Sequence, residues 1–398
     1  MRKCILILLL AFLPAASVPA PVSEEECTTA VITGAAAADG KPILWKNRDT
    51  DQLSNKVVFV DEKPYSYLAV VNAGDNAGRI AWGGLNARGF AIINSVAYNL
   101  PQKSGESADL EGIVMADALR TCASAGDFEE HLNKNLGPDF GCRTNFCVID
   151  AHGGAAIFEV HNNGYKRLNA AETSEKYLLN TNFSRSGTAD QGAGYLRFDR
   201  EVELFKSVPA GKLSHELVLQ TLARDLGHSL LRHPAPAEWK MYSADQPVWI
   251  HTNYTINRPT TASTILIHGV KEGEDPLRAT LWVILGEPIC SIALPIWVAA
   301  GETPEEVRSG KDAEIYREAA RLQNMLRPLK GRDRREYIDL TRLDNKEGKG
   351  WLPGNLKLEK EILTETATLM KADPTPAQLH DFQNKAASRV LSALKSIQ

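Results

Sequence analysis

The sequence has few cysteines, almost no net charge and one uninterrupted hydrophobic run. Six cysteines in 398 residues are too few for a fold built on disulfides. Lys and Arg number 45 against 49 Asp and Glu, a formal charge of −4 without the basic excess expected of nucleic-acid proteins. The chain also lacks P-loop, dinucleotide-binding, H-E-x-x-H and C-x-x-C patterns. We therefore expect no nucleic-acid partner, no cofactor and no metal.

The uninterrupted hydrophobic run lies close to the N-terminus. Arg2 and Lys3 precede the apolar residues 4–13, and small residues follow at 15–17. This run is too short for a membrane anchor and is typical of a secretory signal peptide; the alternative is a buried N-terminal helix. We assign residues 1–17 to a signal peptide. The mature protein is then expected to be secreted or periplasmic, with no stable membrane anchor.

Short apolar or alternating runs predict strands, and longer amphipathic segments predict helices. The expected strands are 28–33, 43–46, 56–60, 67–71, 90–95, 144–150, 155–161, 263–268 and 280–285, and the expected helices are 112–124, 127–135, 197–206 and 215–226. Glu287 and Pro288 divide the apolar segment 279–300 into two buried strands. From residue 303 the chain is charged and mostly helical, and a helix is expected to begin with Thr303 as cap and Pro304 first. This order predicts an α+β fold with a helical C-terminal extension at 303–398, packed on the same domain.

Four cysteines have two interpretations in an oxidising compartment. Cys122, Cys142, Cys147 and Cys290 form two disulfides, in any of three connectivities, or remain buried free thiols. The sequence does not choose between them.

Cys27 follows three glutamates and directly precedes the first predicted strand. A lipoprotein cysteine would need small apolar residues before it, and a structural disulfide would leave an odd thiol among the other four. The third interpretation is an N-terminal nucleophile, exposed when the bond after Glu26 is cut. A free α-amine has a pKa of about 7.7–8, so that part of it is neutral at neutral pH and accepts the thiol proton.

The residues that follow support the third interpretation. Cys27, Thr28 and Thr29 precede a Gly turn at 39–41 and the run Lys-Asn-Arg-Asp at 46–49; residues 84–91, 180–183, 195–198 and 281–296 continue the pattern. In this order they resemble the N-terminal nucleophile (Ntn) amidohydrolases. The most similar branch is penicillin acyltransferase-like, with kinship to choloylglycine hydrolases, acid ceramidase-type amidases and a dipeptidase family. The resemblance implies a four-layer αββα sandwich over residues 27–302.

The resemblance also implies roles for particular residues. Cys27 matches the nucleophile, and Asp49 matches the carboxylate that holds the α-amine. Asn182 matches the side-chain donor of the oxyanion hole, and a backbone N–H near Asn94 would be the second donor. Arg197 matches an arginine that braces the site; its alternative is a solvent-facing residue of an amphipathic helix.

Lys46 stands where these families have an arginine. A lysine still favours a neighbouring thiolate electrostatically, but lacks the planar fork for bidentate contacts. If the register shifted by two, Arg48 would replace it and the carboxylate would be Asp51. We favour Lys46 with Asp49, against the alternative that the two form a surface ion pair.

These inferences predict an exported hydrolase of linear amides, including N-acyl amino acids. Residues 18–26 would be a propeptide, and the substrate would be a small-molecule amide bound as an acyl-enzyme on Cys27. The alternatives are an acyltransferase that uses the same acyl-enzyme and a secreted binding protein with an inert Cys27. A homo-oligomer is possible.

Overall fold

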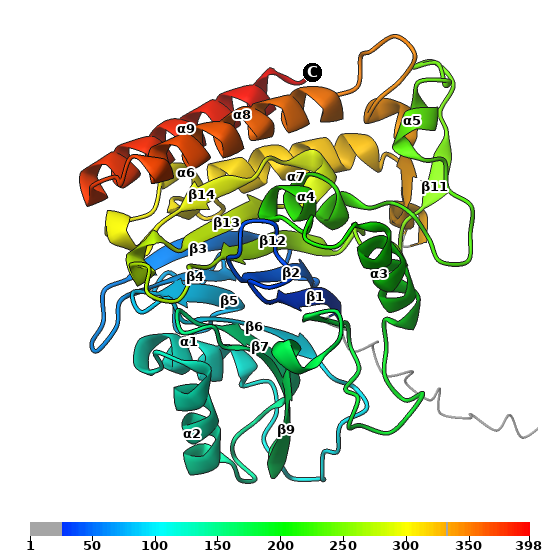
Figure 1. Ribbon diagram of the computed structural model, residues 1–398. Helices are drawn as coiled ribbons and strands as arrows, with labels where there is room; N and C mark the ends of the chain where they lie inside the picture. The colour runs from blue at the N-terminus through cyan, green and yellow to red at the C-terminus, as the bar shows by residue number, and fades with distance from the viewer. Residues whose placement is uncertain (1–25, 332) are drawn as a thin grey trace, which may run out of the picture.

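A computed structural model describes residues 26–331 and 333–398 of the chain. The expected signal peptide, and the expected propeptide apart from Glu26, lie outside the described residues. Most of the described strands form two antiparallel sheets that face each other in the middle of the molecule (Figure 1). Strand pairs such as β1–β6 and β2–β7 are in contact across this interface.

The first sheet has the strand order β10-β1-β2-β12-β13-β14. Its strands are β1 (Glu26–Ile32), β2 (Ile43–Asp49), β10 (Tyr177–Asn180), β12 (Thr261–His268), β13 (Thr280–Leu285) and β14 (Leu294–Ile296). The second sheet runs from β3 to β9 in sequence order. Its strands are β3 (Asn55–Val60), β4 (Tyr67–Asn72), β5 (Gly83–Asn86), β6 (Ala91–Val96), β7 (Arg143–Ile149), β8 (Ala155–His161) and β9 (Gly164–Asn169). A separate pair joins β11 (Trp249–His251) to β15 (Tyr337–Asp339).

Helices cover the outer face of each sheet. The second sheet carries α1 (Glu111–Thr121) and α2 (Ala125–Asn135), and Phe128 of α2 packs edge-on against Phe146 and Phe158. The first sheet carries α3 (Tyr195–Ser207), α4 (His215–Gln220), α7 (Glu314–Leu326), α8 (Leu352–Lys371) and α9 (Pro376–Ser396). Two short helices, α5 (Pro236–Trp239) and α6 (Glu305–Arg308), complete the described helices. The order helix, sheet, sheet, helix confirms the predicted αββα sandwich and α+β class.

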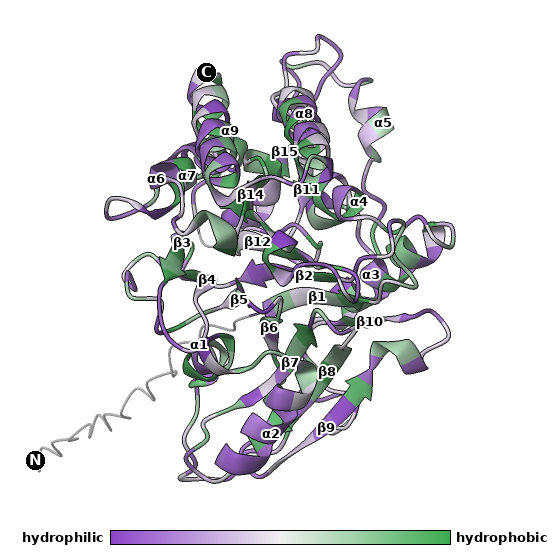
Figure 2. Ribbon diagram, turned by 60° about the vertical axis from the view of Figure 1, so that its left-hand side comes forward, coloured by the Kyte–Doolittle hydropathy of each residue, from purple (hydrophilic) through white to green (hydrophobic). Residues whose placement is uncertain are grey.

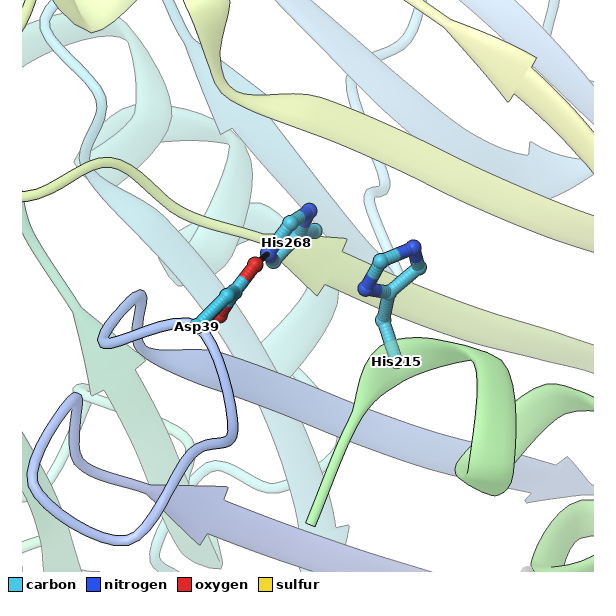
Figure 3. A group of neighbouring side chains, drawn as sticks. All are labelled: Asp39, His215 and His268. Atoms are coloured by element: carbon cyan, nitrogen blue, oxygen red, sulfur yellow. Dashed lines mark hydrogen bonds and ion pairs between the residues drawn. The ribbon is translucent and has the colours of Figure 1, made fainter. Parts of the chain in front are cut away.

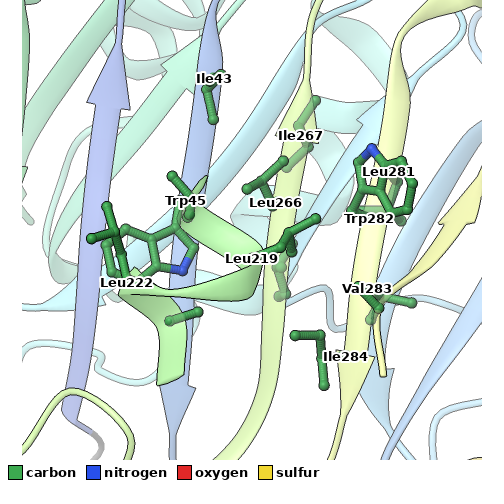
Figure 4. Packing of buried hydrophobic residues seen from close by; sticks show 14 of the residues in the cluster. Ile43, Trp45, Leu219, Leu222, Leu266, Ile267, Leu281, Trp282, Val283 and Ile284 are labelled. Atoms are coloured by element: carbon green, nitrogen blue, oxygen red, sulfur yellow. The ribbon is translucent and has the colours of Figure 1, made fainter. Parts of the chain in front are cut away.

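The C-terminal helices are part of this architecture. Helices α7, α8 and α9 lie over β13 and β14, at the top of Figure 1, and one hydrophobic cluster runs from the first sheet into them. Figure 4 shows the neighbouring part of that cluster, where Leu219 and Leu222 lie over Trp45 and Leu266. Figure 2 shows hydrophobic residues in the inner strands β7 and β8 and hydrophilic residues along α2.

Two predicted elements differ from the structure. The helix after residue 303 begins with Pro304 as its N-cap, because the Thr303 hydroxyl donates instead to the main-chain oxygen of Val57. The helix expected over 215–226 ends at Gln220, and a separate 3₁₀ turn, Leu222–Arg224, follows. Among the described residues, no helix combines the length and the apolar character needed to span a membrane.

Candidate active site

Cys27 is the second residue of β1, which lies between β10 and β2 in the first sheet. Its side chain is buried, with 3% of the residue exposed. Side chains alternate across a strand, so Cys27 shares a face with Thr29, whose Oγ1 lies 3.9 Å from the Sγ of Cys147 in the second sheet. Cys27 therefore points into the interface between the sheets, whereas Glu26 points to the opposite face, toward α3.

Two buried side chains hold the backbone of Cys27. Its N–H donates to Oδ1 of Asn182 at 2.8 Å, and its carbonyl oxygen accepts from Nη1 of Arg197 at 2.8 Å. Arg197 also donates to Oγ1 of Thr28 at 2.9 Å and to Oδ1 of Asn182 at 2.9 Å. Because Arg197 is fully buried, it is not the solvent-facing residue of the alternative interpretation. The structure thus brings three of the predicted site residues into one cluster.

The two candidate cations point toward the second sheet from β2. Arg48 is the cross-strand partner of Cys27, and Lys46 is that of Thr29, so both share the face of the Cys27 side chain. Lys46 Nζ donates to Oδ1 of Asn94 at 2.6 Å. Arg48 donates to two asparagines of the second sheet and lies over the Trp82 ring, 4.4 Å from its centroid. Both cations therefore belong to the buried interface and not to a surface ion pair.

The candidate carboxylates differ in burial. Asp49 is the last residue of β2 and is 1% exposed, whereas Asp51 lies beyond the strand and is exposed. Thr261 donates to Oδ1 of Asp49 at 2.7 Å, but Oδ2 has no hydrogen-bond partner among the described residues. Burial raises the pKa of Asp49 to about 6, although the charges of Arg258 and Arg197 act in the opposite direction. The geometry favours Asp49 over Asp51 as a site carboxylate.

The predicted contact between Asp49 and the α-amine concerns the processed chain. In the 398-residue chain the Cys27 nitrogen is an amide and donates to Asn182. The predicted oxyanion donor is also engaged, since Nδ2 of Asn182 donates to the main-chain oxygen of Val96 at 3.0 Å. Nδ2 of Asn94 donates to Oγ1 of Thr144 at 3.3 Å. The roles of Asp49, Asn182 and Asn94 in catalysis remain predictions.

Sequence reasoning missed two residues of this cluster, Arg258 and the side chain of Glu26. Oε2 of Glu26 accepts from Nη2 of Arg197 at 2.8 Å and from Nη1 of Arg258. Burial acts to raise the pKa of Glu26, but the two arginines outweigh it and hold the pKa below its ordinary value. Arg258 lies in an irregular loop just before β12, where no periodicity marks a buried position. No local signal could have identified it.

The other four cysteines that the structure describes are free thiols. Cys122, Cys142, Cys147 and Cys290 are all buried and unbridged, which selects the thiol alternative over the two disulfides. Burial raises the pKa of Cys122 and of Cys147 to about 12, and it raises the pKa of the other two as well. These thiols are therefore poor nucleophiles.

Asp39, His215 and His268 form a further cluster whose ligand atoms lie within 4.8 Å of one another (Figure 3). They lie at the opposite end of the first sheet from Cys27, because His268 pairs with Ile43 at the start of β2. Nε2 of His268 lies 2.8 Å from Oδ2 of Asp39, and the two imidazole rings stack with centroids 4.1 Å apart. The three residues offer donors of the kind that bind zinc, but the hydrogen bond between His268 and Asp39 and the ring stacking already account for their arrangement.

No protein-family model matches the chain, and no curated protein matches its sequence. The chain is similar in structure to a Caenorhabditis elegans orthologue of N-acylethanolamine-hydrolyzing acid amidase, with 11% identity, a TM-score of 0.41 and coverage of 61% of this chain and 92% of that one. A mutant of conjugated bile acid hydrolase from Clostridium perfringens has 11% identity, a TM-score of 0.36 and coverage of 65% and 89%. Penicillin V acylase from Agrobacterium tumefaciens has 14% identity, a TM-score of 0.35 and coverage of 68% and 86%. By name, the three are an amidase, a hydrolase and an acylase. Because these similarities are remote, the function proposed below rests on this chain's own residues.

Proposed function

We propose that this chain is the precursor of an exported cysteine Ntn hydrolase, which cleaves a linear amide through an acyl-enzyme on Cys27. The observation that carries the proposal is the double anchoring of the Cys27 backbone by buried Asn182 and Arg197. A cysteine that only fills the core, such as Cys147, needs no such support for its peptide unit. The anchoring holds the nitrogen and the thiol of one residue in a defined relation, which an N-terminal nucleophile requires.

The proposed turnover uses the nitrogen and the sulfur of Cys27 in turn. The free amine accepts the thiol proton, Sγ attacks the substrate carbonyl carbon, and the oxyanion is stabilised by donors that include Asn182. The amine then protonates the leaving nitrogen, and the carbon–nitrogen bond breaks to give a thioester. Water hydrolyses the thioester and restores the thiol. Arg48 and Lys46 favour the thiolate because they lie on the same face of the sheet.

Maturation would follow the same chemistry. While Glu26 is bonded to Cys27, the nitrogen is an amide and cannot act as a base. The thiol attacks the Glu26 carbonyl carbon, the carbon–sulfur bond replaces the carbon–nitrogen bond, and the thiol proton moves to the nitrogen. Water then releases residues up to Glu26 as a carboxylic acid. The mature chain begins at Cys27.

Intact mass and N-terminal sequencing of the exported protein test the proposal. We expect wild type to begin at Cys27, whereas Cys27→Ala retains Glu26 and has no amidase activity. Cys27→Ser should mature slowly because a hydroxyl is the weaker nucleophile. Cys122→Ala, which removes another buried thiol, is the matched control and should mature normally. An active preparation that still carries Glu26 would falsify the proposal.

A trapping experiment tests the acyl-enzyme itself. Hydroxylamine added during turnover of an amide should yield the hydroxamate of the acyl group, and Cys27→Ala should yield none. The proportion of acyl group transferred to an added amine, compared with that released to water, separates an acyltransferase from a hydrolase.

A further inference from the structure

The carboxylate of Glu26 is bound more elaborately than a discarded propeptide residue requires. Arg197 and Arg258 both donate to its Oε2, and both arginine side chains are less than a tenth exposed. Arg258 is held in turn by Nη2 donation to Oδ1 of Asn253 at 2.9 Å. Two guanidinium groups that converge on one carboxylate, and that other side chains hold in place, form an anion-binding site.

Glu26 occupies the acyl side of the bond that maturation breaks. Its carbonyl carbon is attached to the Cys27 nitrogen, and in the acyl shift it becomes attached to Sγ of the same residue. A substrate carbonyl carbon must reach the same two atoms, since it bonds to Sγ while its nitrogen takes a proton from the Cys27 amine. The Glu26 side chain, which continues from the carbonyl carbon through Cα, therefore marks the path of a substrate's acyl chain.

Departure of Glu26 leaves a positive site. Arg197 and Arg258 lose the carboxylate that both contact, and the charge that remains beside them is Asp49, whose Oδ2 lies 4.0 Å from Arg197 and 3.9 Å from Arg258. Two buried guanidinium groups with one carboxylate favour entry of another carboxylate, because an uncompensated buried charge is costly.

We propose that Arg258 and Arg197 form an acyl-side carboxylate subsite, so that the preferred substrates are amides of an acid that carries a second, distal carboxylate. The proposal rests on the proposed function, because it places the substrate where the Glu26 acyl group lies. An N-glutaryl amide has the same number of carbon atoms between carbonyl and carboxylate as Glu26. It is therefore the member of the class that matches Glu26 in length.

Three amides place the charge in different positions and so test the subsite with matured full-length protein. N-glutaryl-4-nitroanilide carries a carboxylate on the acyl side, N-pentanoyl-4-nitroanilide carries none, and N-pentanoyl-4-aminobenzoate carries it on the amine side. We expect kcat/KM for the glutaryl amide to exceed that of the other two by about 10- to 100-fold, the range for a hydrogen-bonded charge. Equal values, or a preference for the aminobenzoate, overturn the subsite.

Substitution of Arg258 should remove this preference. Arg258→Met should bring the ratio of kcat/KM for glutaryl and pentanoyl amides close to one, and Arg258→Lys should restore part of it. Arg200→Met is the matched control, since Arg200 lies on α3 one turn after Arg197 but pairs with Asp225. An unchanged ratio in Arg258→Met overturns the inference.

A binding measurement on matured wild type tests the subsite even if the variants fail to mature or if wild type cleaves none of the three amides. Calorimetric titration of matured wild type with N-methylglutaramate should show binding about tenfold or more tighter than with N-methylpentanamide. Equal binding contradicts the subsite. Absence of a mature N-terminus at Cys27 contradicts the proposed function instead, and cleavage of the pentanoyl amide without a glutaryl preference contradicts the subsite alone.

Discussion

Arg197 contacts groups on both sides of the peptide bond between Glu26 and Cys27. It donates to the Glu26 carboxylate on one side and to the Cys27 carbonyl oxygen on the other, and it also contacts Asn182. A planar guanidinium can satisfy several acceptors in fixed directions, which a lysine cannot. In the proposed mechanism, this one buried side chain positions the scissile bond before maturation and the nucleophile after it.

Maturation should depend on the charge of Asp49. Burial raises its pKa to about 6, so the carboxylate is charged above that pH and neutral below it. The acyl shift releases an amine at Cys27, which takes a further proton from water, and the charged carboxylate stabilises the resulting ammonium group. We expect the rate of maturation, followed by intact mass, to fall as the pH drops through about 6. Asp49→Asn should mature at least tenfold more slowly at pH 7, because the substitution removes one charged interaction that stabilises the product of the shift.

Asp51→Asn is the control for this prediction, because Asp51 is exposed beyond the end of β2. It should mature at the wild-type rate. If Asp49→Asn matured at the wild-type rate at pH 7, the carboxylate would have no part in the reaction.

At the scale of elements, α4 joins the outer layer to the first sheet through its first turn. Ser214 caps the helix by accepting from the Leu217 N–H at 3.1 Å, and His215 follows it. The His215 ring stacks on His268 of β12 and lies near Trp282 of β13. Burial, aided by the charge of His268, lowers the pKa of His215 to about 3, although Asp39 opposes the shift.

This lowered pKa predicts acid destabilisation. Between pH 6.5 and 3 the unfolded chain binds a proton at His215 that the folded chain does not, so the stabilisation is complete above pH 6.5 and is lost as the pH falls. The loss should reach about 2 kcal/mol at pH 5. In His215→Gln, urea unfolding at pH 7 and pH 5 should show a smaller difference than in wild type. His152→Gln, at an exposed turn, should show the wild-type difference; an equal difference in His215→Gln would contradict the assignment.

At the scale of the whole molecule, buried ion pairs attach the C-terminal helices to the sandwich. Glu359 of α8 accepts from Arg224 at 3.0 and 2.7 Å and from the N–H of Ala293 at 2.6 Å. Glu287 and Arg327 form a second pair that links the segment after β13 to the end of α7. Buried ion pairs, as well as the shared hydrophobic core, therefore hold the helices after residue 303 against the sandwich.

Removal of one partner should show this attachment. Glu359→Ala leaves Arg224 buried and uncompensated, so we expect the free energy of unfolding to fall by about 3–5 kcal/mol. Lys360→Ala removes the neighbouring side chain, which forms an exposed pair with Glu216. This substitution should change the free energy of unfolding by no more than about 0.5 kcal/mol. Urea unfolding measures both. A loss below about 1 kcal/mol in Glu359→Ala would mean that the pair contributes little.

Local patterns predicted the elements well where short, largely apolar runs are bounded by turn residues. The strands at 144–150 and 155–161 lie within a residue of β7 and β8, and both strands are buried along nearly their whole length. The cap at Thr303 was wrong because the hydroxyl found a partner 246 residues away in the sequence. A hydrogen bond of that kind competes with capping and leaves no trace in the local sequence.

From the sequence alone we predicted that Cys27 directly precedes the first strand, and that Lys46, Asp49, Asn182 and Arg197 follow in an order that resembles the Ntn amidohydrolases. Only the tertiary structure decided which of these side chains share a face, because strand pairing sets Cys27 opposite Arg48 and places Asp49 with Glu26 on the other side. It also brought in Arg258, which lies 232 residues from Glu26 in the sequence. The physical reason is that a buried charge is stabilised by partners in space, and neither periodicity nor composition records where those partners lie.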